Sequence, residues 1–297
     1  MTDGLRATGL HKSFGDVAAL RGIDLEVPRG QLSGFLGPNG AGKTTTMRGI
    51  LGLVAMDAGK VTWEGHPIGE DDRRHIGYMP QERGLYPRMK VHEHIAYMGR
   101  LAGLDRTTAS RRASEWAERV GLSDRGDDLI QELSTGNQQR VQLAVALVHE
   151  PVLMILDEPF AGLDPIAVAT LSEVMAEQVA RNVSVVFSSH QLELVQDLAE
   201  QVTIVAAGET QATGTVSELR SRSPNRLLEI QWNGTIPDWS PPDSEPREAP
   251  AGVSRFVVPA ATDAGALVAS AAAAGRVSAI SFEPPGLDEV FLELVSQ

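Results

Sequence analysis

The sequence predicts an α/β protein with a parallel sheet at its centre, an antiparallel β layer, a helical insertion and a small α+β domain at the C-terminus. Continuous apolar runs, the pattern of strands buried on both faces of a parallel sheet, occur four times. They are residues 31–36, 151–156, 183–189 and 202–207. With 297 residues, of which 42% are hydrophobic, the chain can form one large domain or two unequal ones.

The first part of the chain predicts the antiparallel layer. Residues 5–14, 19–28 and 59–65 combine a mixed apolar and polar alternation with glycine and proline between the segments. Such short segments are typical of strands that expose one face.

A helical insertion is predicted over about residues 82–150. Two apolar faces with helical spacing lie within it. They are Val91, Ile95, Met98 and Ala102 on one face, and Ala113, Trp116, Ala117 and Val120 on the other. A third helix follows Ser134, whose simplest role is that of an N-cap. A helix start also presents free backbone N–H groups to an anion.

The composition changes near residue 222, which predicts domains at 1–221 and 222–297. The second segment has the order β-β-α-β-α and includes a long loop from Asn233 to Pro250. Its last helix carries an apolar stripe expected to serve packing or docking. The stripe consists of Leu287, Val290, Phe291 and Leu294.

Charge and cysteine content exclude several classes of function. The 39 acidic residues outnumber the 26 basic ones, which argues against nucleic-acid binding through a broadly basic surface. The chain contains no cysteine, so disulfides, thiolate metal sites and thiol catalysis are excluded. The N-terminus lacks a secretory signal, and no apolar run reaches the roughly 20 residues of a membrane span. The protein is therefore expected in the cytoplasm, with any membrane role depending on a partner.

The segment GPNGAGKT, Gly37 to Thr44, matches the phosphate-loop pattern G-x-x-x-x-G-K-[ST] between a predicted strand and a predicted helix. Its glycines allow the backbone N–H groups to wrap phosphates, Lys43 adds a positive charge, and the Thr44 hydroxyl can ligate Mg²⁺. The expected nucleotide contacts in this segment are Gly37, Pro38, Asn39, Gly40, Ala41, Gly42, Lys43, Thr44 and Thr45.

A pair of carboxylates supplies the second half of the chemistry. The strand VLMIL ends in Asp157 and Glu158, which places both at the carboxyl edge of the sheet beside the phosphate loop. Asp157 is predicted to hold Mg²⁺, and Glu158 to act as general base on the attacking water. Together the two motifs predict hydrolysis of a nucleoside triphosphate.

The order of these motifs over residues 1 to about 220 resembles the ATP-binding subunits of ABC transporters, which implies a P-loop NTPase core. The resemblance implies that Gln81 in YMPQERG contacts Mg²⁺ and the attacking water, that Asp164 in AGLDP is the D-loop aspartate, and that His190 in FSSH contacts the γ-phosphate. Phe14 in KSFG matches the aromatic residue that stacks on adenine. Without the resemblance, His190 and Phe14 would have been interpreted as structural residues.

The segment LSTGN, Leu133 to Asn137, matches the family's signature L-S-G-G-Q with two departures. Thr135 replaces a glycine and Asn137 replaces the glutamine, which puts the glutamine's contact in doubt. Ser134 and Gly136, which contact the γ-phosphate in the family, are retained. The resemblance implies that two subunits close head to tail, so that this signature meets the ATP of a second copy or a homologous subunit.

Three segments resemble the subunits of bacterial export systems of the sodium- and drug-exporting kind. They are QERGLYPRMKV, LSTGNQQRVQLA and PPGLDEVFLELV. The resemblance implies a transmembrane permease partner and a place on the cytoplasmic face of the cell membrane. The expected docking residues are Arg83, Leu85, Tyr86 and Met89.

Two alternatives remain open at this point. One is an import ATPase with a regulatory C-terminal domain. The other is a soluble ABC ATPase that acts on DNA or ribosomes, against which the single phosphate loop, the absent cysteines and the absent coiled coil all argue.

Overall fold

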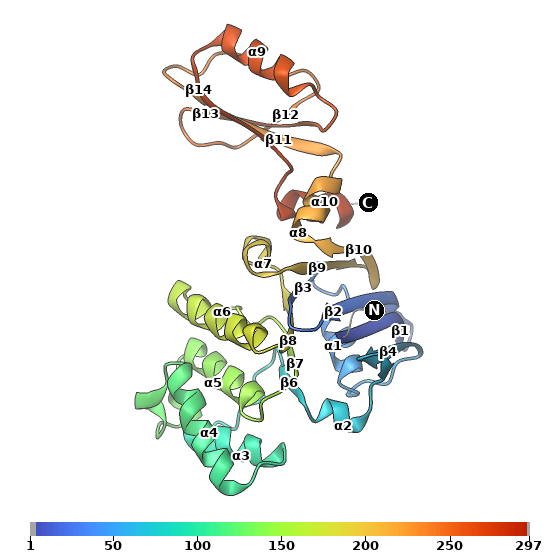
Figure 1. Cartoon of the computed structure of the whole chain (residues 1–297), viewed down its shortest axis with the longest axis vertical. Helices are drawn as coiled ribbons and strands as arrows, with labels where there is room; N and C mark the ends of the chain where they lie inside the picture. Colours follow the sequence, from blue (N-terminus) through green and yellow to red (C-terminus); the bar gives the residue numbers. More distant parts are fainter. Residues whose placement is uncertain (1–3, 296–297) are drawn as a thin grey trace. The chain divides into compact units, whose positions relative to one another are not determined.

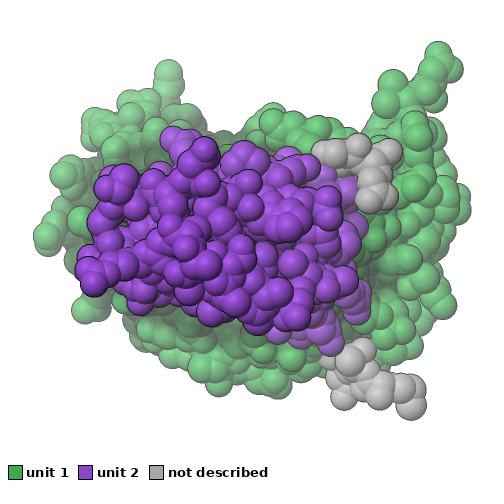
Figure 2. All heavy atoms as spheres, turned by 90° about the horizontal axis from the view of Figure 1, so that it is seen from above, with its two compact units in different colours: residues 1–214 green, residues 215–297 purple. Residues whose placement is uncertain are grey.

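The computed structural model describes residues 4–295. The chain forms two compact units, Met1–Gly214 and Thr215–Gln297, which are coloured separately in Figure 2. This division falls before the predicted boundary at 221, because helix α8 (Val216–Arg222) contacts the last helix of the chain, α10 (Leu287–Val295).

A six-stranded sheet forms the centre of the first unit, in the order β10-β9-β3-β8-β7-β6. All four pairings from β9 to β6 are parallel. The strands are β3 (Leu32–Leu36), β6 (Ile76–Met79), β7 (Leu153–Leu156), β8 (Ser184–Ser189), β9 (Gln201–Ala206) and β10 (Glu209–Thr215). The four predicted buried strands are confirmed. The short edge strand β6, in which glycine interrupts the apolar pattern, was not predicted.

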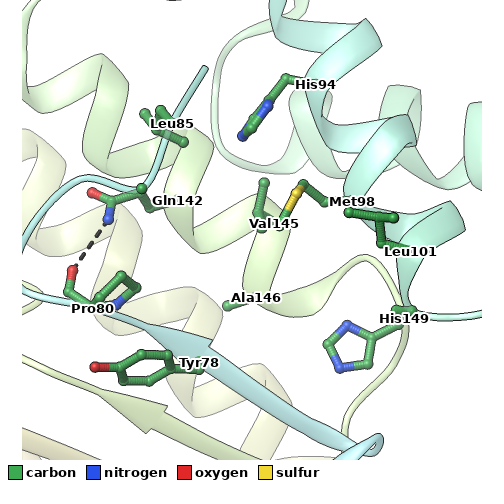
Figure 3. Close-up of a pocket in the computed structure, with 12 residues that line it drawn as sticks. Tyr78, Pro80, Leu85, His94, Met98, Leu101, Gln142, Val145, Ala146 and His149 are labelled. Carbon is green, nitrogen blue, oxygen red and sulfur yellow. Dashed lines mark hydrogen bonds between the residues drawn. The ribbon is translucent and has the colours of Figure 1, made fainter. Parts of the chain in front are cut away.

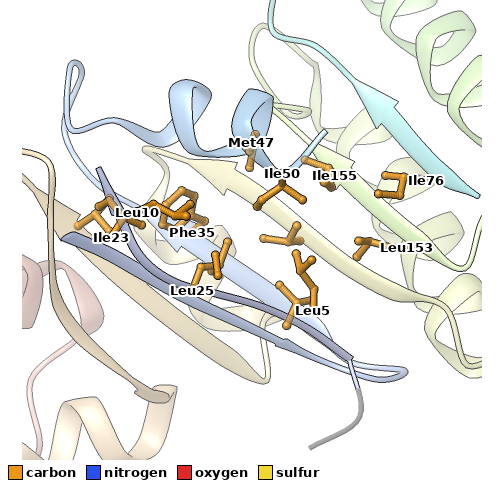
Figure 4. Packing of buried hydrophobic residues seen from close by; sticks show 14 of the residues in the cluster. Leu5, Leu10, Ile23, Leu25, Phe35, Met47, Ile50, Ile76, Leu153 and Ile155 are labelled. Carbon is orange, nitrogen blue, oxygen red and sulfur yellow. The ribbon is translucent and has the colours of Figure 1, made fainter. Parts of the chain in front are cut away.

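The predicted antiparallel layer is a four-stranded sheet in the order β2-β1-β4-β5. Its strands are β1 (Gly4–Phe14), β2 (Val17–Pro28), β4 (Ala58–Trp63) and β5 (His66–Pro67). Apolar side chains of this layer, of helix α1 (Lys43–Ile50) and of the parallel sheet form one buried cluster (Figure 4). Leu10 and Ile23 pack there with Phe35 of β3, and all three are fully buried. The cluster therefore anchors both ends of the phosphate loop, which connects β3 to α1.

The helical insertion contains helices α3, α4 and α5, preceded by the short helix α2 (Figure 1). Their bounds are α2 (Glu70–Arg73), α3 (Val91–Leu101), α4 (Arg106–Arg119) and α5 (Thr135–Leu147), with 3₁₀ turns η1 (Ser123–Arg125) and η2 (Ile130–Glu132). The predicted face around Trp116 is buried throughout. On the other predicted face, Ala102 is exposed, because α3 ends at Leu101 and His94 takes part in the buried face instead.

Two further helices, α6 (Pro165–Ala180) and α7 (Leu192–Leu198), contact the parallel sheet. Helix α7 approaches β3 closely at Gly34, where a Cβ atom would lie 2.5 Å from Cγ1 of Val195. No helix among the described residues is long and apolar enough to cross a membrane.

The second unit is an antiparallel sheet in the order β12-β13-β11-β14 with three helices. Its elements after α8 are β11 (Asn225–Trp232), β12 (Glu245–Arg247), β13 (Val253–Pro259), α9 (Ala264–Ala274), β14 (Val277–Glu283) and α10. Helix α9 and the sheet share a separate core around Leu228, Ile230 and Phe256. The short strand β12 lies inside the predicted loop, where proline-rich flanks hid it.

Candidate functional site

The phosphate loop runs from the end of β3 into α1 and depends on glycine at both of its ends. A Cβ atom at Gly37 would lie 2.4 Å from the backbone oxygen of Val205. Gly42, the N-cap of α1, has a φ of 100°, and a Cβ atom there would lie 2.5 Å from Cδ2 of Leu20. A larger residue at either position would push the loop away from its neighbours. Glycine therefore keeps the loop in place, with the N-terminus of α1 available to bind an anion.

The side chain of Lys43 folds back onto the start of the phosphate loop. Its ammonium group donates hydrogen bonds to the backbone oxygens of Gly37 at 2.6 Å and Pro38 at 3.3 Å. The same group lies 3.9 Å from Oε1 of Glu158. Burial lowers the pKa of Lys43, and the negative charges of Glu158 and Asp157 oppose that shift. The side chain thus places its amino group against the backbone of the loop.

Asp157 and Thr44 present oxygen atoms next to the loop. The Thr44 hydroxyl donates a 2.7 Å hydrogen bond to Oδ2 of Asp157, which is 1% exposed. A hydroxyl and a carboxylate oxygen are ligands that Mg²⁺ accepts, usually together with phosphate oxygens and water. The described residues contain no group of three or more His, Cys, Asp or Glu side chains that could hold a metal on its own. The donor set therefore fits an ion that arrives with a nucleotide.

Glu158 directs its carboxylate toward His190. Nδ1 of His190 lies 2.8 Å from Oε2 of Glu158, whose side chain is buried while that of His190 is largely exposed. The backbone of Glu158 has a φ of 52°, a left-handed conformation that costs a non-glycine residue about 1–3 kcal/mol. Such strain persists where the surrounding structure fixes the residue. This backbone conformation places the Glu158 carboxylate next to Lys43 of the phosphate loop.

Lys43, Thr44 and Glu158 border a cavity of about 440 Å³, whereas the predicted site residues Gly37, Asp157 and His190 are not part of its lining. It is lined by Phe14, Ala19, Pro38, Asn39, Gly40, Ala41, Gly42, Lys43, Thr44, Thr45, Gln81 and Glu158. Phe14 is 52% exposed, and the Lys12 ammonium lies 5.4 Å from the centre of its ring. The structure thus brings together at one cavity Phe14, the loop and Gln81, which come from distant parts of the sequence.

Ser134, Gly136 and Asp164 do not line this cavity. Ser134 is the N-cap of α5, as predicted, and accepts a 3.4 Å hydrogen bond from the Asn137 N–H. Asp164 is the N-cap of α6 and accepts a 2.8 Å hydrogen bond from the Ala167 N–H. The two helix starts are neighbours, since a Cβ atom at Gly136 would lie 3.7 Å from Cδ2 of Leu163. The two helix starts thus lie beside each other and outside the lining of the phosphate-loop cavity.

Two buried polar side chains that contact the segment from Asp157 to Pro159 were not predicted from the sequence. Ser188 of β8 is buried between Asp157 and Glu158 and makes hydrogen bonds to both residues. Gln139 of α5 is also buried and donates a 3.0 Å hydrogen bond to the backbone oxygen of Pro159. The available signal was a polar residue within an otherwise apolar element, but only the three-dimensional structure shows what each contacts.

A second, mostly apolar cavity of about 350 Å³ lies between Pro80, α3 and α5 (Figure 3). Its lining includes Leu85, Met98, Leu101 and Val145, whereas the predicted docking residues Arg83, Tyr86 and Met89 do not line it. We call this cavity the α3–α5 groove.

His94 lines this groove, and Arg83 immediately precedes its lining residues Gly84 and Leu85. Neither ring nitrogen of buried His94 has a hydrogen-bond partner among the described residues, and burial lowers its pKa to about 4. Arg83 donates a 3.0 Å hydrogen bond to Oε1 of Gln138, which connects the segment after Gln81 to the start of α5.

Comparison with known proteins identifies the family to which the chain belongs. Residues 20–161 match the protein-family model for ABC transporters. YhaQ, an uncharacterized ABC transporter ATP-binding protein of Bacillus subtilis strain 168, is 44% identical over 209 residues, which are 70% of each chain. The linearmycin resistance ATP-binding protein LnrL of the same organism is 38% identical over 221 residues, which cover 73% of this chain and 71% of LnrL.

A solved structure of an ATP-binding subunit of an ABC transporter superposes with a TM-score of 0.68 at 30% identity. It covers 73% of this chain and 92% of its own chain. The shared fold is thus the P-loop NTPase core with its antiparallel layer and helical insertion. On this sequence identity, this fold and this phosphate-loop cavity, the chain belongs to the ATP-binding subunits of ABC transporters and is an ATPase.

Proposed function

We propose that this ATPase powers a separate membrane permease and that the transported compound leaves the cell. The power comes from ATP hydrolysis, and the observation that carries this part of the proposal is the contact of Glu158 with both His190 and Lys43 beside the phosphate loop. This arrangement places a carboxylate base beside two groups that can interact with a terminal phosphate. A carboxylate in this position can accept a proton from the water that attacks the terminal phosphate.

The side chains at and next to the cavity have separate tasks in this proposal. Lys43 and the loop N–H groups bind the phosphates, and the ring of Phe14 stacks on adenine. Thr44, Asp157 and Gln81 hold Mg²⁺, which would neutralise part of the phosphate charge. Glu158 takes a proton from the attacking water while His190 keeps the carboxylate in place and contacts the γ-phosphate.

The separate position of Ser134, Gly136 and Asp164 supports a dimeric site. These residues lie at two neighbouring helix starts and do not line the cavity of their own chain. Helix starts favour anions. We propose that they complete the ATP site of a second copy of this chain, or of a homologous subunit, when two chains close head to tail.

The α3–α5 groove is the proposed contact with the permease. It is mostly apolar and lies next to Pro80 and Leu85, close in sequence to Gln81 at the nucleotide. The permease would hold this subunit on the cytoplasmic face of the membrane. Export is favoured by the similarity to LnrL, because removal of a toxic compound from the cell is a direct route to resistance.

Replacement of Glu158 by glutamine tests the central assignment. The variant is expected to bind ATP but to lose turnover by about 10²–10⁴-fold, because the general base is absent. With ATP and Mg²⁺ it should elute as a dimer in size-exclusion chromatography, since ATP is not consumed. Glu173→Gln, on α6 outside the cavity, is the control and should hydrolyse ATP normally. A monomeric Glu158→Gln variant that still hydrolyses ATP would overturn the proposal.

The partner is tested separately by affinity purification from membranes. Recovery of a membrane polypeptide without a solute-binding protein supports an export system. Recovery of a solute-binding protein would indicate import instead, and recovery of nucleic acid would contradict a transport role.

A further inference from the structure

Ser188 lies on β8, the strand next to β7, whose end carries both carboxylates. Its hydroxyl donates a 2.7 Å hydrogen bond to Oδ1 of Asp157. Oγ of Ser188 also accepts a 2.8 Å hydrogen bond from the backbone N–H of Glu158. The side chain is fully buried, so water does not compete for these two bonds.

The two bonds of Ser188 act on two different groups of the site. At Asp157 the bond fixes Oδ1, which leaves Oδ2 directed toward the Thr44 hydroxyl at 2.7 Å. At Glu158 the bond fixes the backbone N–H of a residue whose φ of 52° is strained. One hydroxyl thereby sets the orientation of a carboxylate and the backbone of its neighbour.

We infer that Ser188 is a positioning residue for ATP hydrolysis: it orients Asp157 toward the metal and holds Glu158 in the conformation that reaches the attacking water. The inference rests on the proposed roles of Asp157 and Glu158. Removal of a group that hydrogen-bonds to a metal-ligating side chain and orients it commonly lowers metal affinity or activity. Ser188 itself does not line the nucleotide cavity.

A merely structural serine would affect folding and nothing else, and the chain offers a matched control for that possibility. Ser184 lies on the same strand, is equally buried, and accepts a 3.3 Å hydrogen bond from the backbone N–H of Gly30. It does not line the nucleotide cavity. Ser184→Ala and Ser188→Ala therefore remove the same atom from the same strand.

The test compares Ser188→Ala, Ser188→Thr and Ser184→Ala in the full chain. Ser188→Ala is expected to weaken Mn²⁺ binding in the presence of ADP, measured by electron paramagnetic resonance, by about 10- to 100-fold. Its kcat should fall, its KM for ATP should stay near the wild-type value, and more Mg²⁺ should be needed for half-maximal hydrolysis. Ser188→Thr keeps the hydroxyl and should restore both readouts. Ser184→Ala should leave both unchanged.

The inference is overturned if folded Ser188→Ala binds Mn²⁺ and hydrolyses ATP like the wild type, or if Ser184→Ala loses as much. A folded Ser188→Thr protein with the same defects in Mn²⁺ binding and ATP hydrolysis as Ser188→Ala would also count against a role for the hydroxyl. Thermal denaturation establishes which variants are folded. Glu158→Gln tests the proposed function independently, because its expected loss of turnover does not depend on Ser188. If Glu158→Gln loses turnover while Ser188→Ala behaves like the wild type, only the inference about Ser188 is wrong.

Discussion

Gly37 shows how a single residue determines the shape of the phosphate loop. A methyl group at this position would lie 2.4 Å from the backbone oxygen of Val205, which cannot rotate away as a flexible side chain could. Gly37→Ala is therefore expected to destabilise the protein by about 1–3 kcal/mol and to weaken ATP binding, because the loop must shift. Urea denaturation and calorimetric titration with ATP measure the two effects.

Gly84→Ala is the control for this substitution. Nothing lies within 4 Å of a Cβ atom at Gly84, and its φ lies outside the left-handed region. The control should keep both stability and ATP affinity. Equal stability of the two variants would show that the contact with Val205 is unimportant.

Phe14 is an exposed member of the predicted nucleotide contacts, since 52% of its surface is accessible to solvent. Phe14→Ala is expected to weaken ATP binding by about tenfold or more, because stacking of a base on an aromatic ring contributes roughly 1–3 kcal/mol. Phe14→Trp should retain the affinity. Fluorescence titration with ATP measures this difference.

Val17 provides the comparison for Phe14. It is 67% exposed on the adjoining strand β2 and does not line the cavity. Val17→Ala should bind ATP like the wild type. If Phe14→Ala also binds normally, the ring does not stack on adenine.

At the scale of the elements, the sequence predicts those parts in which residue pattern and burial agree. The strands β3, β7, β8 and β9 were predicted because each is a continuous apolar run inside the sheet. β6 and β12 were missed because each is short and is held mainly by its neighbours in the sheet, and β10 because it is a partly exposed edge strand with few apolar residues. An element stabilised by pairing with distant residues carries little signal in its own sequence.

The same reasoning separates the predictable and unpredictable parts of the site. The phosphate loop, Asp157 and Glu158 lie in contiguous motifs, so their chemistry is visible in the sequence. Ser188 acquires its role only because β8 is hydrogen-bonded to β7. That strand order is a property of the folded sheet.

Helix α3 places a neutral histidine beside the α3–α5 groove. Burial lowers the pKa of His94 from its ordinary value of 6.5 to about 4. Between these pH values the unfolded chain binds a proton that the folded chain does not. The free energy of unfolding should therefore fall as the pH drops from 6.5 to 4, by at most about 1.4 kcal/mol per pH unit from this group.

The variant His94→Leu should lose this contribution, so that its stability declines less steeply with acid than that of the wild type. Urea denaturation at pH 7, 6 and 5 measures the slope. His75→Leu, which alters an exposed histidine, should keep the wild-type slope. Parallel slopes for His94→Leu and the wild type would contradict the assignment to His94.

At the scale of the whole molecule, each unit has an apolar core of its own. One core joins the two sheets and α1 of the first unit, and the other lies between α9 and the sheet of the second unit. The nucleotide cavity is lined only by residues of the first unit. Calorimetry should consequently resolve two unfolding transitions, of which ATP with Mg²⁺ raises only one.

Matched substitutions assign these transitions to the two units. Leu228→Ala in the second core and Leu25→Ala in the first both remove a buried leucine, a change that typically costs about 2–5 kcal/mol. Leu228→Ala should lower the transition that ATP does not affect, and Leu25→Ala should lower the one that ATP raises. A single transition that responds to both substitutions and to ATP would show instead that the two units unfold together, and that residues 215–297 contribute to the stability of the nucleotide-binding unit.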